Sequence, residues 1–419
     1  MEYSTGIEEV QIPVGMKEVD ARSLYERLQG VKDGRGKRGR RYGAAVVLTL
    51  LLLAKLAGET KLRGIAEWAW LRREALAKQL PLRLGKTPCA NSYRNVCEQV
   101  DVGELNAVLG EYFAERNRSQ AEAVVVVSPP VASPVEPTPP THLALDGKSL
   151  RGTRRSGAAA QSAVHTLGLY NVTERYMWQQ QSFPGKGQER QAAMTLIDPL
   201  NLQGTVVSAD ALHTHPKWAQ AILDRGGEYL MMAKGNQSAL REAVAFLFSQ
   251  PIRPFLFPEG EAHTVTKGHG RLERRHLRTS CELNDYLAPR WPQVAQVFHL
   301  ERTVMRLGKT TKELVYGLTS LTPQQAPPLH LLSLVRQHWH IENRNHWRRD
   351  VTLGEDACRV AVGQAPLVLA ALNNAVLALV DFLDWSNLAS AQRFFDAHPD
   401  KALDLLLCPT ACQTLLSFV

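Results

Sequence analysis

The stretch HLALDGKSLRG, residues 142–152, predicts a buried strand that ends in an acid. Its apolar residues lead to Asp146, and glycines and basic side chains follow. A second stretch, VVSAD at 206–210, repeats the pattern and ends in Asp210. A carboxylate at the end of a buried strand costs free energy unless something pairs with it. If the two strands are neighbours, Asp146 and Asp210 meet at one edge of a sheet.

Outward from these acids, strands and helices alternate. After the strand at 142–146, the pattern predicts strands at 165–172 and 176–183 and a helix at 189–200. A strand at 205–209, a helix at 216–225 and a strand at 228–233 follow. This order predicts the α/β class, with a mixed sheet and helices packed on it.

Changes in composition and periodicity divide the chain into six segments. We predict a small all-α domain at 1–118, an extended proline-rich linker at 119–140 and the first part of the sheet at 141–237. A β-rich insertion at 238–325, the last helices of the core at 326–384 and a helical tail at 385–419 follow. Within the fifth segment, one long helix is expected over 328–349.

Composition excludes several classes of protein. The 419 residues are 44% hydrophobic and 21% charged, as in a globular chain with a large core and unlike a disordered or collagen-like one. Six scattered cysteines form no CxxC pair, which favours free thiols over a disulfide scaffold. The apolar run at 44–57 is shorter than a membrane span, and MEYSTGIEEV lacks the pattern of an export signal. We therefore expect a cytoplasmic protein that does not act at a membrane.

The two strand-end acids point to metal chemistry. Hard divalent cations prefer carboxylate oxygens, and two carboxylates can share two metal ions. The alternative for Asp146 is a turn aspartate, and for Asp210 a helix N-cap. His213 and His215 could be metal ligands, but a surface or capping role is favoured for both.

A third acid, Glu342, lies in the predicted long helix. His338, Asn345, His346 and Arg349 share its stripe at helical spacing. Such a stripe suits a helix that delivers a carboxylate to a metal site and polar groups to DNA phosphates. The alternative is a solvated helix held by i,i+4 pairs. Trp339 and Trp347 are interpreted as packing anchors.

The net charge of +8 favours an anionic partner, with nucleic acid first. A basic cluster lies among glycines near residue 38, and a second crowds a predicted hairpin near residue 271. The alternative for the first cluster is a flexible, solvated charge run. The predicted DNA-binding residues are Arg35, Lys37, Arg38, Arg40, Arg41, Lys148, Arg151, Lys234, Lys267, Arg271, Arg275, Asn345 and Arg349.

Four ordered blocks resemble bacterial DDE insertion-sequence transposases of the H-repeat-associated type linked to Rhs elements. They are LALDGKSLRG, SADALHTHPKWAQAILDRGGEYLMMAKGNQ, KGHGRLERR and HWHIENRNHWRRDVTLGEDACRV. The N-terminal RGRRYGAAVVLTLLLLAKLAG and IAEWAW also resemble that group's helical domain.

The resemblance implies an RNase H-like core in which Asp146, Asp210 and Glu342 are the catalytic, metal-binding acids, with a β insertion before Glu342. It also implies two Mg²⁺ (or Mn²⁺) ions, double-stranded DNA as transposon end and target, and a homodimer in the active complex on nucleoid DNA. The expected activity is metal-dependent strand cleavage and strand transfer. The proline-rich segment is unusually long for the group. That leaves open a domesticated DNA-binding protein or a nuclease without transposition.

Overall fold

The computed structural model describes residues 22–36, 40–82, 85–127, 140–155, 162–185, 187–250, 259–268 and 270–408. Its centre is one nine-stranded sheet with the order β3-β2-β1-β4-β5-β9-β8-β7-β6. The strands are β1 (Thr141–Leu150), β2 (Val164–Asn171), β3 (Tyr176–Phe183), β4 (Thr205–Ala209), β5 (Glu228–Ala233), β6 (Glu259–Gly268), β7 (Arg271–Ser280), β8 (Gln296–Arg306) and β9 (Lys309–Thr319).

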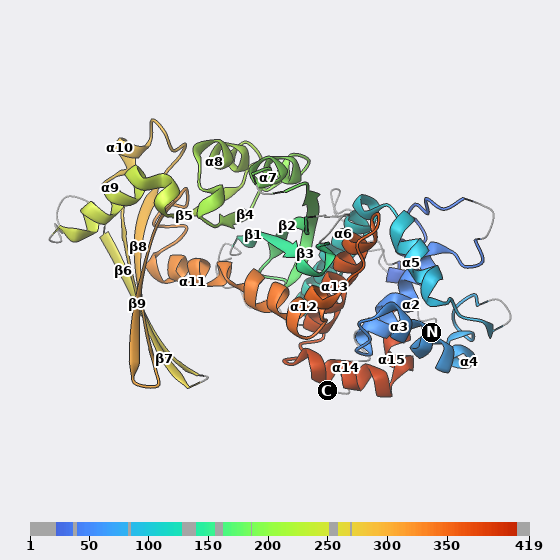
Figure 1. Cartoon of the computed structure of the whole chain (residues 1–419). Coiled ribbons are helices and arrows are strands. Elements are labelled where there is room, and N and C mark those ends of the chain that lie inside the picture. Colours follow the sequence, from blue (N-terminus) through green and yellow to red (C-terminus); the bar gives the residue numbers. More distant parts are fainter. Residues whose placement is uncertain are drawn as a thin grey trace, which may run out of the picture.

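The sheet has two parts. In the first, β1 pairs antiparallel with β2 and parallel with β4, and β5 extends the parallel part. In the second, β6 to β9 form an antiparallel run that joins the first part where β9 pairs with β5. Figure 1 shows these four strands as a long extension at one side of the molecule. The predicted mixed α/β fold with a β-rich insertion is therefore confirmed.

Helices cover both faces of this sheet. On one face, α7 (Glu189–Ile197), α8 (Pro216–Leu223) and α9 (Ser238–Ser249) pack on residues such as Leu143 and Leu145. On the other face, α11 (Pro328–His338) packs on Val206 and Leu230. Because side chains alternate along a strand, His142, Ala144 and Asp146 point to the α11 face. The short α10 (Asn284–Leu287) lies between β7 and β8.

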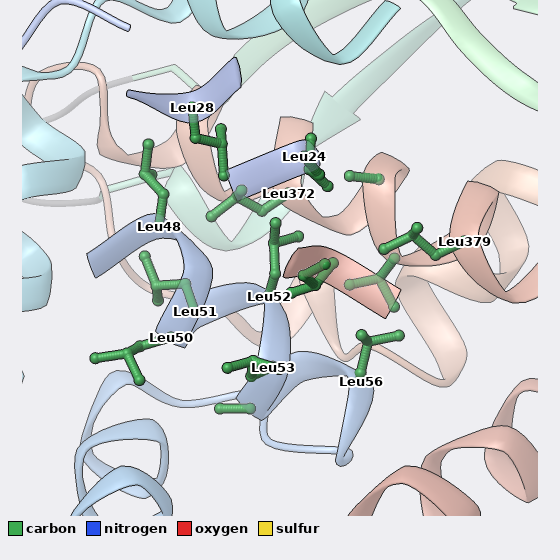
Figure 2. Packing of buried hydrophobic residues seen from close by; sticks show 14 of the residues in the cluster. Leu24, Leu28, Leu48, Leu50, Leu51, Leu52, Leu53, Leu56, Leu372 and Leu379 are labelled. Carbon is green, nitrogen blue, oxygen red and sulfur yellow. The ribbon is translucent and has the colours of Figure 1, made fainter. Parts of the chain in front are cut away.

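A second, helical core holds both the N-terminal and the C-terminal helices. The N-terminal helices are α1 (Leu24–Leu28), α2 (Ala44–Leu56), α3 (Leu62–Leu71), α4 (Arg73–Leu76), α5 (Ala90–Gln99) and α6 (Val102–Val127). They share one hydrophobic cluster with α13 (Ala365–Phe382), α14 (Leu388–Ala397) and α15 (Pro399–Leu407). Figure 2 shows Leu24 and Leu28 of α1, the leucines of α2, and Leu372 and Leu379 of α13 around this core.

The helix α13 is long and apolar enough to cross a membrane by length and composition alone. It is longer than the apolar run at 44–57 that stands out in the sequence. Of its apolar window, 83% is buried inside the protein. This degree of burial is what a core helix shows, and α13 contacts α2, α5, α6 and β3.

Two segments differ from the sequence-based expectation. The helix α6 continues to Val127, so the first nine residues of the predicted extended linker are helical. Alanine, glutamine and glutamate in that part favour a helix, and the first prolines come only at 129 and 130. Residues 128–139 lie outside the described part of the chain. The strand β1 also continues past Asp146, because 146–150 pair with β2.

Candidate active site

The two strand-end aspartates occupy matching positions on neighbouring strands. In the parallel pair of β1 and β4, Leu145 is opposite Ala209, so Asp146 and Asp210 each follow by one residue. Side chains alternate between the two faces of a sheet, and Leu145 and Ala209 point away from α11. The residues that follow them, Asp146 and Asp210, therefore lie on the α11 face. The two strands are therefore neighbours, which is the condition under which the sequence brings the two acids to one edge of the sheet.

Glu342 reaches this place from a π-helix, η5 (Ile341–His346), which interrupts the predicted helix between α11 and α12 (Trp347–Val351). Just before Glu342, Ile341 is buried against Ala144 of β1 and Tyr170 of β2. That contact fixes the start of η5 on the strand that carries Asp146. Single π-turns within helices are frequent at functional sites.

Asp146, Glu342 and His346 form a cluster in which one ligand atom of each lies within 4.8 Å of the others. The His346 Nδ1 atom is 3.4 Å from Asp146 Oδ2 and 3.8 Å from Glu342 Oε2. His346 is buried, whereas Glu342 is half exposed. The other oxygen of Asp146, Oδ1, accepts a hydrogen bond of 2.8 Å from the backbone N–H of Gly147. One carboxylate edge is therefore anchored and the other faces the cluster.

Burial and the imidazole shift these groups in different directions. Burial raises the pKa of Asp146. The contact with the His346 ring lowers the pKa of Glu342 to about 2. Burial alone would lower the pKa of His346, but the two carboxylates outweigh it and raise that pKa. The two acids therefore favour protonation of the imidazole that contacts them both.

Asp210 has a second role in this structure. Its carboxylate caps the short turn η3 (Ala211–His213), accepting a hydrogen bond of 3.0 Å from the backbone N–H of Leu212. Among the described residues, the cluster of ligand atoms around Asp146 does not include Asp210. The capping role that the sequence offered as an alternative is therefore present, and the metal-binding role of Asp210 stays a prediction. His213 is buried, and His215 caps α8 by accepting from the backbone N–H of Trp218.

A buried hydrogen-bonded chain holds α11 on the two strands that carry the aspartates. The hydroxyl of Ser208 on β4 is 2.7 Å from His142 Nε2 on β1 and 2.9 Å from His338 Nδ1 on α11. His142 Nδ1 continues the chain to Gln337 Oε1 at 3.3 Å. Since α11 is followed by η5, these hydrogen bonds help to position Glu342 relative to the sheet.

Two predicted DNA contacts on the Glu342 stripe are wrong. Asn345 and Arg349 are each 1% exposed, so neither reaches a phosphate in this structure. The Arg349 side chain pairs with Glu355 of η6 (Glu355–Ala357), with Nη2 to Oε2 at 2.8 Å. Asn345 donates to Asn374 Oδ1 of α13 at 3.0 Å. Their partners lie outside the stripe, in the following turn and in α13, so the stripe alone gave no sign of this inward orientation.

Lys148, another predicted DNA contact, is also buried and paired. Its Nζ atom is 2.6 Å from Asp350 Oδ1 and 4.0 Å from Glu355 Oε2. The polar chain continues from Glu355 Oε1 to Asn373 and on to Lys55 Nζ of α2. Burial lowers the pKa of Lys55. These residues connect the helical core to the strand of Asp146 and leave Lys148 unavailable for phosphate.

The remaining predicted DNA-binding residues fall into three groups. Exposed side chains are present at Arg41, Arg151, Lys234, Lys267 and Arg271, of which Arg151 pairs with Asp356 and Arg271 with Glu273. Acid partners occupy others: Arg35 and Arg40 pair with Asp33, and Arg275 pairs with Glu273. Lys37 and Arg38 lie outside the described residues. Of the exposed group, Lys234 follows β5 at the end of the sheet where Asp210 follows β4.

The structure adds three residues that sequence reasoning missed or misplaced. His346 was noted only as part of the Glu342 stripe, yet it contacts both acids, and its i,i+4 spacing from Glu342 was the available signal. The interpretation of Trp339 and Trp347 as packing anchors is wrong, because they are 43% and 57% exposed. Both rings are open to solvent on the segment that carries Glu342.

The donor set of this cluster fits a divalent cation. Two carboxylates and one imidazole offer oxygen and nitrogen ligands within reach of one ion. Burial disfavours the charged form of the Asp146 carboxylate. A bound cation would offset this free-energy cost. The half-exposed Glu342 leaves one side of the cluster open to solvent and to a substrate.

Comparison with known proteins identifies the family of this chain. Residues 137–372 match the family model described as Transposase DDE domain, and residues 25–113 match the one described as DDE_Tnp_1-associated. In Escherichia coli K12, YbfL and the "H repeat-associated putative transposase YhhI" are each 28% identical over 252 residues. Each alignment covers 57% of this chain and 63% of the relative.

Two further comparisons extend over more of the chain. "Putative transposase YncI" of Escherichia coli O157:H7 is 23% identical over 362 residues, which is 85% of this chain and 87% of that protein. A cryo-EM structure of the piggyBac transposase synaptic complex with hairpin DNA aligns over 92% of this chain and 87% of that one, at 11% identity. Its TM-score of 0.38 is too low to support a conclusion. The family model covers more than half of the chain, and the chain belongs to the DDE transposase family.

Proposed function

We propose that this protein binds the double-stranded ends of a mobile DNA element and catalyses metal-dependent strand cleavage and strand transfer. The observation that supports this most directly is the convergence of Asp146 and Glu342 from positions far apart in the chain. Asp210 stands at the matching position on the neighbouring strand. Membership of the DDE transposase family supports the same reaction class.

Asp146 and Glu342, with Asp210, would hold Mg²⁺ or Mn²⁺, and two ions are expected. When bound, such ions stabilise the charge that develops on a phosphate and lower the pKa of water. His346 orients the two acids, because its ring lies between them. Gly147 fixes the rotation of Asp146 through its backbone N–H.

In the cleavage step, a water oxygen attacks a phosphorus of the DNA backbone and the bond to the 3′ oxygen breaks. This releases a 3′ hydroxyl and leaves a 5′ phosphate. In the transfer step, the 3′ hydroxyl attacks a phosphorus of the target and displaces the target's own 3′ oxygen. The exposed Lys234, at the sheet end next to Asp210, is placed to contact a backbone phosphate.

DNA binding is proposed to use the exposed basic side chains of the protein. Arg41 and Arg151 are two of these, and Lys267 and Arg271 lie at the tip of the β6–β7 hairpin. Phosphate contacts release counterions, so affinity should fall steeply with salt. Joining two DNA ends needs two copies of the site, for which we propose a homodimer in the DNA complex on nucleoid DNA in the cytoplasm.

Cleavage of linear DNA that carries the element's own ends, with and without Mg²⁺, tests this proposal. Asp146→Asn, Asp210→Asn and Glu342→Gln should each abolish cleavage while DNA binding is retained. Asp285→Asn, on the exposed start of α10, is the matched control and should cleave normally. Efficient cleavage by Asp146→Asn would refute the assignment. Metal-independent DNA binding without any cleavage would instead support a domesticated DNA-binding protein, and cleavage without end specificity a nuclease.

A further inference from the structure

The insertion carries a second cluster of metal-ligating side chains, on strands β6 and β7. His263 and His276 are directly opposite each other in the antiparallel register of these strands. Glu261 lies two residues before His263 on the same strand, so its side chain shares their face. One ligand atom of each of the three lies within 4.8 Å of the others. None of them belongs to the candidate active site.

We propose that Glu261, His263 and His276 form a site for a transition-metal dication of the Zn²⁺ type. Two imidazoles and one carboxylate suit Zn²⁺, Co²⁺ or Ni²⁺ better than Mg²⁺, which prefers oxygen ligands. This inference does not depend on the proposed function, because it concerns other residues and other chemistry.

The distances between the ligand atoms are close to those of a tetrahedral site. With metal–ligand bonds of 2.0–2.2 Å, two ligands of one tetrahedral ion are about 3.3–3.6 Å apart. Here Glu261 Oε2 is 3.1 Å from His276 Nε2 and 3.8 Å from His263 Nε2. The two rings lie stacked, with centroids 4.0 Å apart, so metal binding requires a small rotation of each ring. All three side chains are partly exposed and free to make that rotation.

The charges around the cluster are compatible with a bound cation. Glu301 of β8 is opposite His276 on its other side and adds a further negative charge, although Lys312 Nζ lies 2.8 Å from it. On the same face of β7, Arg278 lies opposite Glu261, and Arg274 lies two residues before His276. The Arg278 guanidinium donates to the carbonyl of Phe248 at 3.0 Å and lies over the Phe248 ring, on the side of α9. The carboxylate of Glu261 contacts both imidazoles.

A bound ion would join the edge strand of the sheet to its neighbour. β6 is the last strand in the sheet order, so only β7 holds it by backbone hydrogen bonds. The tip of the same hairpin carries Lys267 and Arg271, both exposed. With ligands on both strands, the ion would fix their register and reduce the motion of the hairpin that presents these basic residues.

Zinc titration of the metal-free full-length protein by calorimetry tests this site in the absence of DNA. The background is Asp146→Asn with Glu342→Gln, which removes the carboxylates of the other cluster. In that background, we expect one zinc equivalent to bind. Adding His263→Gln and His276→Gln should weaken binding at least tenfold. Adding His398→Gln, an exposed histidine elsewhere, should leave it unchanged.

Cobalt provides an independent readout, because its visible absorption reports imidazole ligands. Co²⁺ should give this absorption in the background protein and lose it with either histidine substitution. Since the histidines are exposed, circular dichroism should show that the variants fold. Equal zinc affinity with and without His263 and His276, or no zinc binding in the background protein, would overturn the proposal. Failure of DNA cleavage in wild-type protein would leave it unaffected.

Discussion

Replacing Ser208 with alanine should destabilise the protein although it removes a single oxygen atom. That hydroxyl lies between His142 Nε2 and His338 Nδ1, and all three side chains are buried. The hydroxyl donates to one imidazole and accepts from the other, so alanine leaves two buried ring nitrogens without a partner. Each unpaired buried polar group costs about 1–3 kcal/mol, so we expect a loss of about 2–6 kcal/mol.

Urea unfolding followed by tryptophan fluorescence measures this loss. Ser182→Ala, on an exposed position of β3, is the matched control and should change the free energy of unfolding by less than about 0.5 kcal/mol. Ser208→Thr keeps the hydroxyl and should recover part of the stability if the added methyl group is accommodated. A Ser208→Ala protein as stable as wild type would refute the reasoning, because His142 and His338 would then have other partners.

The remaining predictions concern the dependence of stability on pH, the packing of the helical core and a glycine that lies against a neighbouring backbone. Burial lowers the pKa of His142 to about 3 and of His338 to about 4, from an ordinary 6.5, so only the unfolded chain takes up these protons between pH 6.5 and 4. The contribution of these two histidines to stability should be constant above pH 6.5 and fall below it, by up to about 1.4 kcal/mol per pH unit for each. His338→Gln should flatten this fall in urea titrations at several pH values, and an unchanged slope would contradict it. Leu52→Ala in the helical core should cost about 2–5 kcal/mol, whereas a loss below about 1 kcal/mol in the same assay would show that the core collapses around the gap. Gly152→Ala should lower the melting temperature in calorimetry, because a Cβ there would overlap the carbonyl oxygen of Cys358, and an unchanged melting temperature would show that this turn is free to move.

The sheet and two of the three acids could be predicted because their signals are local. A short apolar run that ends in an acid is visible at Asp146 and again at Asp210. The sequence left the adjacency of the two strands open, and the structure pairs them in parallel. The β-rich insertion was visible for the same reason, because alternating residues and turns mark each strand.

The surroundings of Glu342 could not be predicted in the same way. A π-helix differs from an α-helix by its hydrogen-bond pattern, which the residue types of 341–346 do not reveal. Arg349 looked like a DNA contact because its acid partner, Glu355, lies in a separate turn. Lys148 looked free for phosphate because Asp350 is about two hundred residues away in the chain. The turn that brings Glu355 back to Arg349 sets the orientation of the arginine, and a long-range ion pair sets that of Lys148.

The core shared by α2 and α13 also has a consequence for synthesis of the protein. All thirteen residues of α2 are buried in the finished fold, yet α13 follows roughly 300 residues later. At about 5–20 residues per second, the ribosome needs roughly 15–60 s to supply that partner. During this interval α1, α3 and α5 can pack on α2, but the apolar face that α13 covers stays exposed to water. The yield of the protein in the cell should therefore depend on chaperones that shield nascent chains.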